Sequence, residues 1–173
     1  MEKYIPDMYQ KSIFDINYKR LKKEGIKCLL IDFDNTMVIP HNKKITKKLK
    51  NLIEEIKKLK IKVIIFSNTY KKNLINPSKE LGVDFVSFAR KPLKGKYQKA
   101  LEKYKYDVNE VATIGDQLKT DIVGGNKVGI TTILVNPLSK KDKLGTKINR
   151  FFENIIFKKL GKKDLMRKGK YYE

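Results

Sequence analysis

Cysteine, histidine and tryptophan are nearly missing from this sequence, because its 173 residues contain one Cys, one His and no Trp. A single thiol cannot form an internal disulfide, and the apolar neighbours of Cys28 favour a buried structural role over a reactive one. His41 is the one histidine, and it follows Pro40 in a predicted loop. A Ser-His-Asp hydrolase needs a catalytic histidine, so this class of enzyme is disfavoured. No apolar run reaches the roughly 18 residues of a membrane span, and the first residues lack the apolar stretch of a secretory signal. We therefore expect a cytoplasmic protein without a transmembrane segment.

Acidic residues are scarce relative to basic ones. Lys and Arg number 40 against 19 Asp and Glu, which gives a net charge of +21. An excess of this size indicates anionic partners, with lipid, nucleic acid and acidic protein as candidates, and does not bear on the fold. A compositional bias toward Lys, Ile and Asn is the alternative explanation. The excess is strong in residues 138–173, which hold twelve Lys or Arg and four Asp or Glu.

Apolar periodicity predicts the fold between residues 27 and 135. Strand patterns alternate there with segments of helical spacing, which is typical of a parallel sheet with right-handed crossovers. The predicted strands are 27–33, 61–66, 83–88, 110–114 and 131–135. The predicted helices are 45–56, a short helix within 70–81, 97–104 and 120–128. We therefore predict an α/β fold of three layers, in which helices cover both faces of a central five-stranded parallel sheet.

The remaining regions are assigned from their patterns as well. Residues 1–26 are expected to form an arm packed on the core, 27–157 the α/β domain, and 158–173 a loose, basic tail. An amphipathic helix is predicted just before the tail. Its apolar stripe consists of Ile148, Phe151, Phe152, Ile155 and Ile156. The pattern leaves open whether this stripe packs on the sheet or contacts an anionic membrane.

Polar residues stand at the ends of the predicted strands, where parallel α/β sheets bind their ligands. They are Asp32, Asp34, Ser67, Lys91, Asp116 and Asp121. Alternate residues of an extended chain share a side, so Asp32 and Asp34 can face one pocket that Asp116 joins from another strand. A hard cation such as Mg²⁺ relieves the repulsion of three carboxylates. One carboxylate can then attack phosphorus while its neighbour transfers protons.

A solvated turn or a helix cap is the alternative reading of an isolated Asp-x-Asp. The buried strand before Asp32 and the Asn35-Thr36 pair after Asp34 argue against that alternative. Gly124-Gly125 also has two readings, a phosphate-cradling loop and a close helix contact, and we favour the helix contact.

The same residues resemble the four motifs of the haloacid dehalogenase (HAD) superfamily in order, spacing and placement. Residues 32–36 (Asp-Phe-Asp-Asn-Thr) resemble the first motif, Ser67 the second, Lys91 the third and residues 115–121 the fourth. A narrower resemblance, to YqeG-like HAD phosphatases, covers about residues 4–155. It rests further on Pro6-Asp7-Met8-Tyr9, Gly124-Gly125-Asn126 and residues 145–150. That group is similar to the mitochondrial and plastid phosphatidylglycerophosphate phosphatases.

The resemblance implies a role for each motif residue. Asp32 is implied as the nucleophile and a Mg²⁺ ligand. Asp34 is implied as the general acid and base, with its backbone carbonyl on Mg²⁺. Asp116 is implied as a further ligand, and Asp121 as one that binds through water or orients Asp116. The implied phosphate-binding residues are Thr36, Ser67, Asn68 and Lys91, with Lys94 and Lys96 as alternatives to Lys91.

The gaps between the motifs leave no room for the cap domain that many HAD enzymes carry. Residues 37–60 and 89–110 are each long enough for a loop and one helix. An uncapped site is open, which favours a bulky substrate such as a lipid headgroup, a phosphoprotein or a nucleic-acid end. A lid supplied by oligomerisation is the alternative.

We therefore predict a Mg²⁺-dependent phosphomonoesterase that forms an aspartyl-phosphate and dephosphorylates phosphatidylglycerophosphate in phospholipid biosynthesis. The predicted location is cytoplasmic, with peripheral contact to an anionic membrane through the basic C-terminal region. One alternative is a nucleotide or nucleic-acid phosphatase, which the charge suits equally. The other is a non-catalytic, basic RNA- or ribosome-binding protein on the same fold. The intact Asp32 and Asp34 and the lack of an aromatic RNA-binding motif argue against this last reading.

Overall fold

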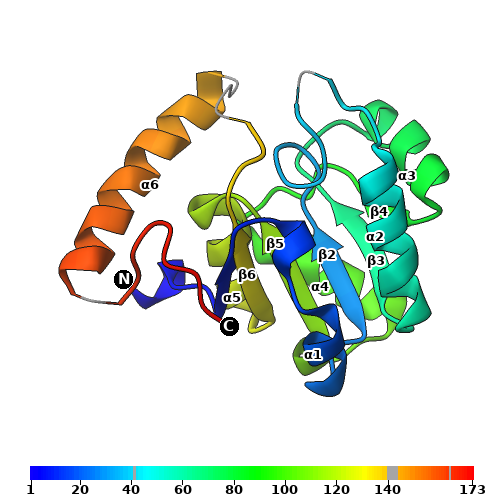
Figure 1. The fold of residues 1–173 in the computed structure, drawn as a ribbon, viewed down its shortest axis with the longest axis horizontal. Helices are drawn as coiled ribbons and strands as arrows, with labels where there is room; N and C mark the ends of the chain where they lie inside the picture. Colours follow the sequence, from blue (N-terminus) through cyan, green and yellow to red (C-terminus); the bar gives the residue numbers. More distant parts are fainter. Residues whose placement is uncertain (41, 140–143, 164) are drawn as a thin grey trace.

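The computed structural model of the chain describes residues 1–40, 42–139, 144–163 and 165–173, so His41 lies outside the described residues. Six parallel strands form one open sheet in the order β1-β6-β5-β2-β3-β4 (Figure 1). The strands are β1 (Met8–Gln10), β2 (Cys28–Ile31), β3 (Lys62–Phe66), β4 (Asp84–Val86), β5 (Val111–Gly115) and β6 (Thr131–Val135). The predicted α/β architecture with a parallel sheet is thus confirmed.

The sequence-based count of five strands is wrong by one, because the N-terminal arm contributes β1. This strand has three residues, too few for a periodic pattern, and its pairing with β6 is long-range. Asp7 fixes the pairing, since its carboxylate accepts hydrogen bonds from the amide (2.7 Å) and the hydroxyl (2.9 Å) of Thr132. An edge strand that depends on one distant side chain leaves little signal in the local sequence.

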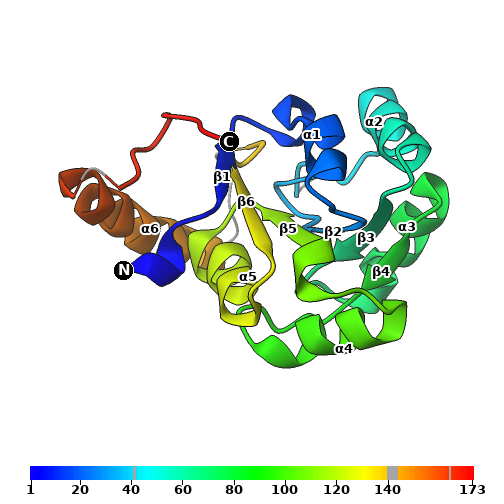
Figure 2. The ribbon, with the colours of Figure 1, turned by 90° about the horizontal axis from the view of Figure 1, so that it is seen from below.

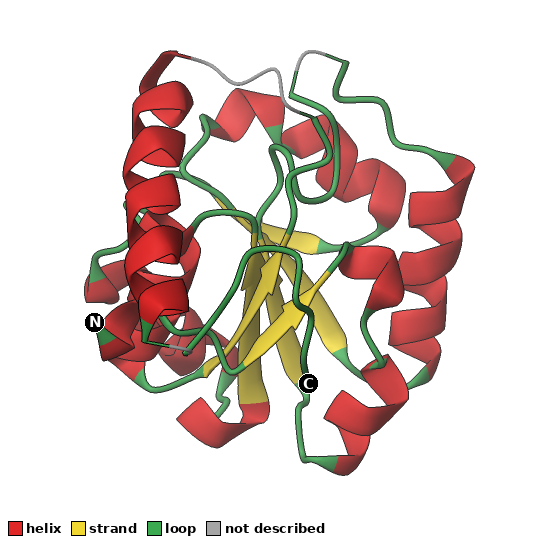
Figure 3. Cartoon of the chain, turned by 60° about the vertical axis from the view of Figure 1, so that its left-hand side comes forward, coloured by secondary structure: helices red, strands yellow, loops and turns green. Residues whose placement is uncertain are grey.

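Helices cover both faces of the sheet, which gives the three predicted layers (Figures 2 and 3). The α-helices are α1 (Tyr18–Lys23), α2 (Lys47–Lys58), α3 (Ile75–Leu81), α4 (Lys94–Tyr104), α5 (Val123–Val128) and α6 (Leu144–Lys162). β2 shows the two-sided burial directly. Leu29 and Ile31 pack on the face that α1 and α2 cover, while Cys28 and Leu30 pack on the face that α4 covers. The predicted structural role of Cys28 agrees with its burial.

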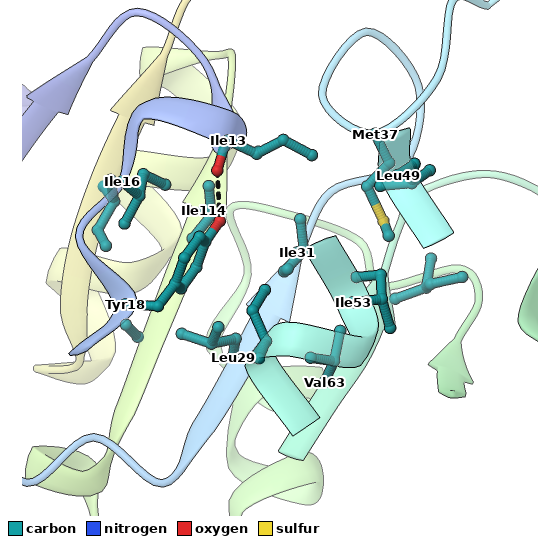
Figure 4. Packing of buried hydrophobic residues seen from close by; sticks show 14 of the residues in the cluster. Ile13, Ile16, Tyr18, Leu29, Ile31, Met37, Leu49, Ile53, Val63 and Ile114 are labelled. Atoms are coloured by element: carbon teal, nitrogen blue, oxygen red, sulfur yellow. Dashed lines mark hydrogen bonds between the residues drawn. The ribbon is translucent and has the colours of Figure 1, made fainter. Parts of the chain in front are cut away.

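The larger core lies between the sheet and α2. Leu49 and Ile53 of α2 point toward Ile31 and Val63 of the sheet (Figure 4). Residues of α2 that meet the core recur at helical spacing, so burial of this stripe stabilises both the helix and the sheet. On the same face, Tyr18 donates a hydrogen bond from its hydroxyl to the carbonyl of Ile13 (2.7 Å), which removes the cost of a buried polar group.

The C-terminal segment is more ordered than the sequence pattern indicates. α6 continues to Lys162, and the backbone of Tyr172 then forms an antiparallel bridge with Tyr9 of β1. The two hydrogen bonds of this bridge measure 2.8 and 2.9 Å. Leu160 and Met166 are buried beside Tyr9. The expectation of a loose tail is therefore wrong for its last residues, because their anchor is a strand that the sequence pattern does not show.

The connections between the site motifs are short. Residues 32–61 hold loops and α2, and residues 87–110 hold a loop, α4 and a short 3₁₀ turn. Neither connection contains a cap domain in its described residues. Within the part of the chain that the structure describes, none of the helices combines the length and the apolar character that a membrane-spanning helix requires.

Candidate active site

Three carboxylates meet where β2 and β5 end. Asp32 follows β2, and its amide donates to the carbonyl of Ile114 (2.9 Å), which holds the first residue past the strand in the sheet. Asp116 follows β5, the hydrogen-bonded neighbour of β2. Asp121 reaches the same point from the turn after β5. One oxygen of each carboxylate lies within 4.8 Å of the others, and the three residues are at most 7% exposed.

Lys91 enters this cluster from the loop between β4 and α4. Its Nζ lies 2.6 Å from Oδ1 of Asp32 and 2.5 Å from Oδ1 of Asp121. The side chain of Asn68 fixes the Lys91 backbone, because it accepts from the Lys91 amide (2.8 Å) and donates to the Lys91 carbonyl (3.3 Å). The structure therefore gives Asn68 a positioning contact that the sequence does not indicate. The sequence-based choice of Lys91 over Lys94 and Lys96 agrees with this geometry.

The electrostatics of the cluster explain why a cation belongs in it. Burial raises the pKa of Asp32 to about 7, and Lys91 opposes part of this effect. Burial alone would lower the pKa of Lys91, but the charges of Asp121 and Asp32 outweigh it and raise that pKa. One ammonium thus faces several carboxylates in a site with little water. An additional positive charge would stabilise the ionised form of Asp32.

The first-motif loop places Asp34 and Thr36 on either side of a tight turn. Asn35 sits in the left-handed region (φ 68°), which Asn tolerates better than most residues. The Thr36 hydroxyl donates to Oδ1 of Asp116 (3.2 Å), so it orients a carboxylate of the cluster. Oδ1 of Asp34 is buried and has no hydrogen-bond partner among the described residues, and Nζ of Lys43 is 4.0 Å away. This oxygen can therefore accept a further hydrogen bond.

Ser67 directly follows β3, and both its backbone groups and its side chain form hydrogen bonds. Its amide donates to the Val86 carbonyl and its own carbonyl accepts from the Ala89 amide, each at 3.0 Å. The hydroxyl oxygen accepts from the amide of Thr69 (3.2 Å), so the hydroxyl proton points elsewhere and can be donated to an anion. Ser67 is 2% exposed. The Ser67 hydroxyl can therefore accept from the Thr69 amide and donate to a phosphate at the same time.

Asp121 is held by the turn that begins the η5 segment (Leu118–Ile122), a single π-helical turn. Its second carboxylate oxygen accepts from the Gln117 amide (3.2 Å) and the Thr120 hydroxyl (3.3 Å). Gly115 is required beneath it, because a Cβ there would lie 2.1 Å from the Asp121 Cγ. π-Helical turns inside helices often mark functional sites.

Glu153 of α6 is a site-supporting residue that lies outside the four motifs. It is 3% exposed, and its Oε1 accepts from the amide of Leu118 at 2.6 Å. Because Leu118 opens the turn that carries Asp121, α6 braces the acidic cluster from outside the motifs. From the sequence pattern, a glutamate in an amphipathic helix is expected to face solvent. The contact between Glu153 and Leu118 therefore becomes visible only in the folded structure.

Gly124 and Gly125 have a packing role, as the sequence analysis favours. A Cβ on Gly124 would lie 2.7 Å from the Tyr97 hydroxyl, and one on Gly125 would lie 2.5 Å from the Thr132 methyl. Both residues are buried in α5, where α4 and the sheet approach closely. The pair is thus a close helix contact.

The donor set fits a hard divalent cation. Three buried carboxylates offer oxygen ligands within reach of one another, and Asp34 adds a buried oxygen that makes no hydrogen bond among the described residues. Carboxylate oxygens with room for water and phosphate oxygens are the ligands that Mg²⁺ prefers. Such an ion would neutralise charge on both the carboxylates and a bound phosphate.

The parallel α/β fold is shared with a solved structure described as a "putative HAD superfamily (subfamily III A) hydrolase" from Legionella pneumophila, with a TM-score of 0.54 and 18% identity over 71% of this chain and 74% of that one. The model of the mitochondrial PGP phosphatase family matches residues 1–139. The chain belongs to this family.

Two relatives narrow the comparison. The "Probable phosphatase YqeG" of Bacillus subtilis is 36% identical over 160 residues, which are 92% of this chain and 93% of that protein. "Phosphatidylglycerophosphate phosphatase 1, chloroplastic/mitochondrial" of Arabidopsis thaliana is 28% identical over 149 residues, or 80% of this chain. This chain spans 42% of the length of the Arabidopsis protein. The predicted resemblance to YqeG-like HAD phosphatases is confirmed.

Proposed function

We propose that the protein is a Mg²⁺-dependent phosphomonoesterase that uses Asp32 as its nucleophile. The observation that carries this proposal is the buried contact of Lys91 with both Asp32 and Asp121 at the carboxyl ends of the strands. A buried lysine between carboxylates costs desolvation energy and is poor evidence for stability. Its presence at the ligand-binding edge of the sheet supports a catalytic purpose.

The proposed reaction has two steps at phosphorus. In the first, a carboxylate oxygen of Asp32 attacks, an acyl-phosphate bond forms, and the ester oxygen leaves with a proton from Asp34. In the second, Asp34 takes a proton from water, the water oxygen attacks phosphorus, and Asp32 is released as a carboxylate. Oδ1 of Asp34, which makes no hydrogen bond among the described residues, is consistent with this proton transfer.

The remaining residues would stabilise the negative charge on the phosphoryl group during these steps. Lys91 and the Ser67 hydroxyl would contact the phosphoryl oxygens, with Thr36 and Asn68 fixing the loops on either side. Mg²⁺, held by Asp32, Asp116, Asp121 and the Asp34 carbonyl, would neutralise the phosphate and lower the pKa of Asp32. Fixed charges of this kind supply most of the stabilisation in phosphoryl transfer.

The proposed substrate is phosphatidylglycerophosphate at the cytoplasmic membrane face, as a step of phospholipid biosynthesis. The family match and the name of the Arabidopsis relative support the substrate class. The short connections around the site support a substrate that stays partly outside it, as a lipid in a bilayer does. The net charge of +21 favours attraction to an anionic surface.

The test is phosphate release from phosphatidylglycerophosphate in anionic vesicles with Mg²⁺, comparing the wild type with Asp32→Asn. We expect release by the wild type and background release by the variant. Turnover of an aryl phosphate that depends on Asp32, without lipid turnover, would reject the lipid substrate and keep the phosphatase. Selective turnover of a nucleotide or an RNA end would favour the nucleic-acid alternative. No turnover of any phosphoester would reject the catalytic mechanism.

A further inference from the structure

A basic and aromatic groove opens beside the loop that delivers Lys91. Its volume is about 590 Å³, and its lining residues are Phe88, Arg90, Leu93, Gly95, Lys96 and Lys99. Three of the six carry positive charge and none is acidic. In the described part of the chain, these three cations have no ion-pair partner. The groove therefore presents uncompensated positive charge on the loop that delivers Lys91 and on α4.

One loop builds both the groove and the active site. Ala89 and Lys91 are buried, whereas the alternate residues Phe88 and Arg90 are exposed. Phe88 and Arg90 both adopt left-handed backbone conformations (φ 47° and 51°), which are unfavourable for such side chains. Strain of this kind persists where surrounding contacts enforce it, and it concentrates at functional sites.

The enforcing contacts come from the loop after β3. The Phe88 amide donates to the Thr69 carbonyl (3.2 Å), the Ala89 amide donates to the Ser67 carbonyl (3.0 Å), and Asn68 clamps Lys91. These bonds hold Lys91 inward and its neighbours outward at the same time. The groove is thus rigidly joined to the reacting centre, one residue away from Lys91.

The outer edge of the groove is apolar. Phe88 is 44% exposed and Leu93 is 58% exposed, although both are large hydrophobic residues. Tyr70, 60% exposed, packs edge-on against Phe88 with 4.8 Å between ring centroids, which extends the apolar surface. Aromatic side chains beside basic ones are typical of the interface between lipid headgroups and acyl chains.

We propose that this groove is the docking site for an anionic phospholipid of the bilayer. The inference rests on the proposed lipid substrate. Arg90, Lys96 and Lys99 bind a phosphodiester, while Phe88 and Leu93 contact the glycerol and upper acyl region. A phosphodiester stands one glycerol away from the terminal phosphate in a glycerophosphate lipid, so one molecule spans the groove and the cluster. The membrane-facing surface is then the rim of the active site, and the C-terminal tail is secondary.

Sedimentation of the full chain with vesicles tests this proposal. The groove variant is Lys96→Gln/Lys99→Gln, and its matched control is Lys19→Gln/Lys23→Gln on α1, with the same loss of charge at exposed positions before β2. Two basic residues at an anionic surface change partitioning by roughly 25-fold. We expect a loss of this order for the groove variant on phosphatidylglycerol vesicles and a much smaller loss for the control. Equal losses in both variants would overturn the proposal.

A second variant separates the apolar edge from charge. Phe88→Asn removes the aromatic ring and keeps a residue that tolerates positive φ, so the loop can retain its shape. We expect weaker vesicle binding and a lower ratio of lipid to aryl-phosphate kcat/KM. Vesicle binding that is unchanged here but lost in Phe151→Ser/Phe152→Ser would place the membrane contact on α6 and overturn the proposal. A groove variant that loses RNA binding but keeps vesicle binding would also overturn the proposal.

Failure of the docking site can be distinguished from failure of the proposed function. Asp32→Asn should bind vesicles like the wild type while releasing no phosphate. If the wild type binds through the groove but hydrolyses only aryl phosphates, the lipid substrate fails and the docking site stands. If lipid hydrolysis is normal in both groove variants, the docking site fails and the function stands.

Discussion

The two ends of the sheet carry the same kind of ion pair in opposite environments. At the amino end, Lys62 pairs with Asp84 at 2.7 Å, and their side chains are 36% and 49% exposed. At the carboxyl end, the Lys91 side chain is 3% exposed and contacts Asp32 and Asp121, which are similarly buried. Geometry alone does not separate the two pairs. Burial does, because water screens the outer pair and is excluded from the inner one.

Burial also decides how each ion pair changes the pKa of its carboxyl group. The Lys62 hydrogen bond lowers the pKa of Asp84, so the outer pair is ionised and relaxed. In the inner cluster, burial raises the pKa of Asp32 despite the lysine beside it. A positive charge beside Asp32 would offset this rise in pKa. Substitutions at both ends of the sheet test the contrast, and we expect the largest effect at Lys91.

Lys91→Met should have the largest effect, because it leaves buried carboxylates without their partner. We expect the free energy of unfolding to fall by about 3–5 kcal/mol and kcat to fall by at least about 100-fold. Chemical denaturation and steady-state kinetics with an aryl phosphate measure the two effects. A stability loss as small as that of an exposed lysine would mean that the cluster is solvated.

Asp32→Asn should abolish turnover and alter the pH dependence of stability. The folded pKa of Asp32 lies near 7, above its ordinary value of 3.8, so the folded state binds the extra proton between these values. Stability of the metal-free wild type should therefore fall as pH rises from about 4 to about 7. Thermal unfolding of both proteins across this range provides the check. A wild-type curve parallel to that of the variant would contradict the raised pKa.

Glu153→Ala should have an intermediate effect. It removes the acceptor for the buried Leu118 amide, which costs about 1–3 kcal/mol of unfolding free energy. Because Leu118 opens the turn that carries Asp121, Mg²⁺ affinity should fall as well. Glu153→Gln retains an acceptor oxygen and serves as the matched control. A metal titration monitored by thermal shift measures the affinity, and equal affinities in Ala and Gln variants would limit Glu153 to a structural role.

Lys62→Met should have the smallest effect. Exposed ion pairs contribute about 0.2–1 kcal/mol, and salt reduces this further. We expect a small change in denaturation midpoint and unchanged kinetics. A loss that approaches the Lys91→Met value would erase the contrast between the two ends of the sheet.

The sequence predicts those parts of the fold and site that have local signals. β2, β3, β5 and β6 are mainly apolar, and polar residues follow them at the edge where parallel α/β sheets bind ligands. The order of these residues also separates Lys91 from its lysine neighbours, through the resemblance to the third motif. The local pattern therefore predicts these strands and brings the polar residues to one edge of the sheet.

The parts that the sequence does not predict depend on partners far along the chain. β1 exists because Asp7 meets Thr132, and the C-terminal segment is ordered because Tyr172 meets Tyr9. Glu153 braces the acidic turn from a helix outside the motifs. In each case the deciding contact joins residues far apart in the chain, so no short window of the sequence contains both partners.

Trapping a phosphorylated form of the enzyme tests whether Asp32 is the nucleophile. Rapid acid quench during turnover of an aryl phosphate with Mg²⁺, followed by peptide mass spectrometry, locates any phosphate bound to the protein. We predict a phosphoryl group on Asp32, formed in the wild type and missing in Asp32→Asn. Turnover that proceeds with phosphate on another residue, or with no phosphoenzyme under conditions that trap one on a known aspartyl-phosphate enzyme, would contradict the assignment of Asp32 as nucleophile.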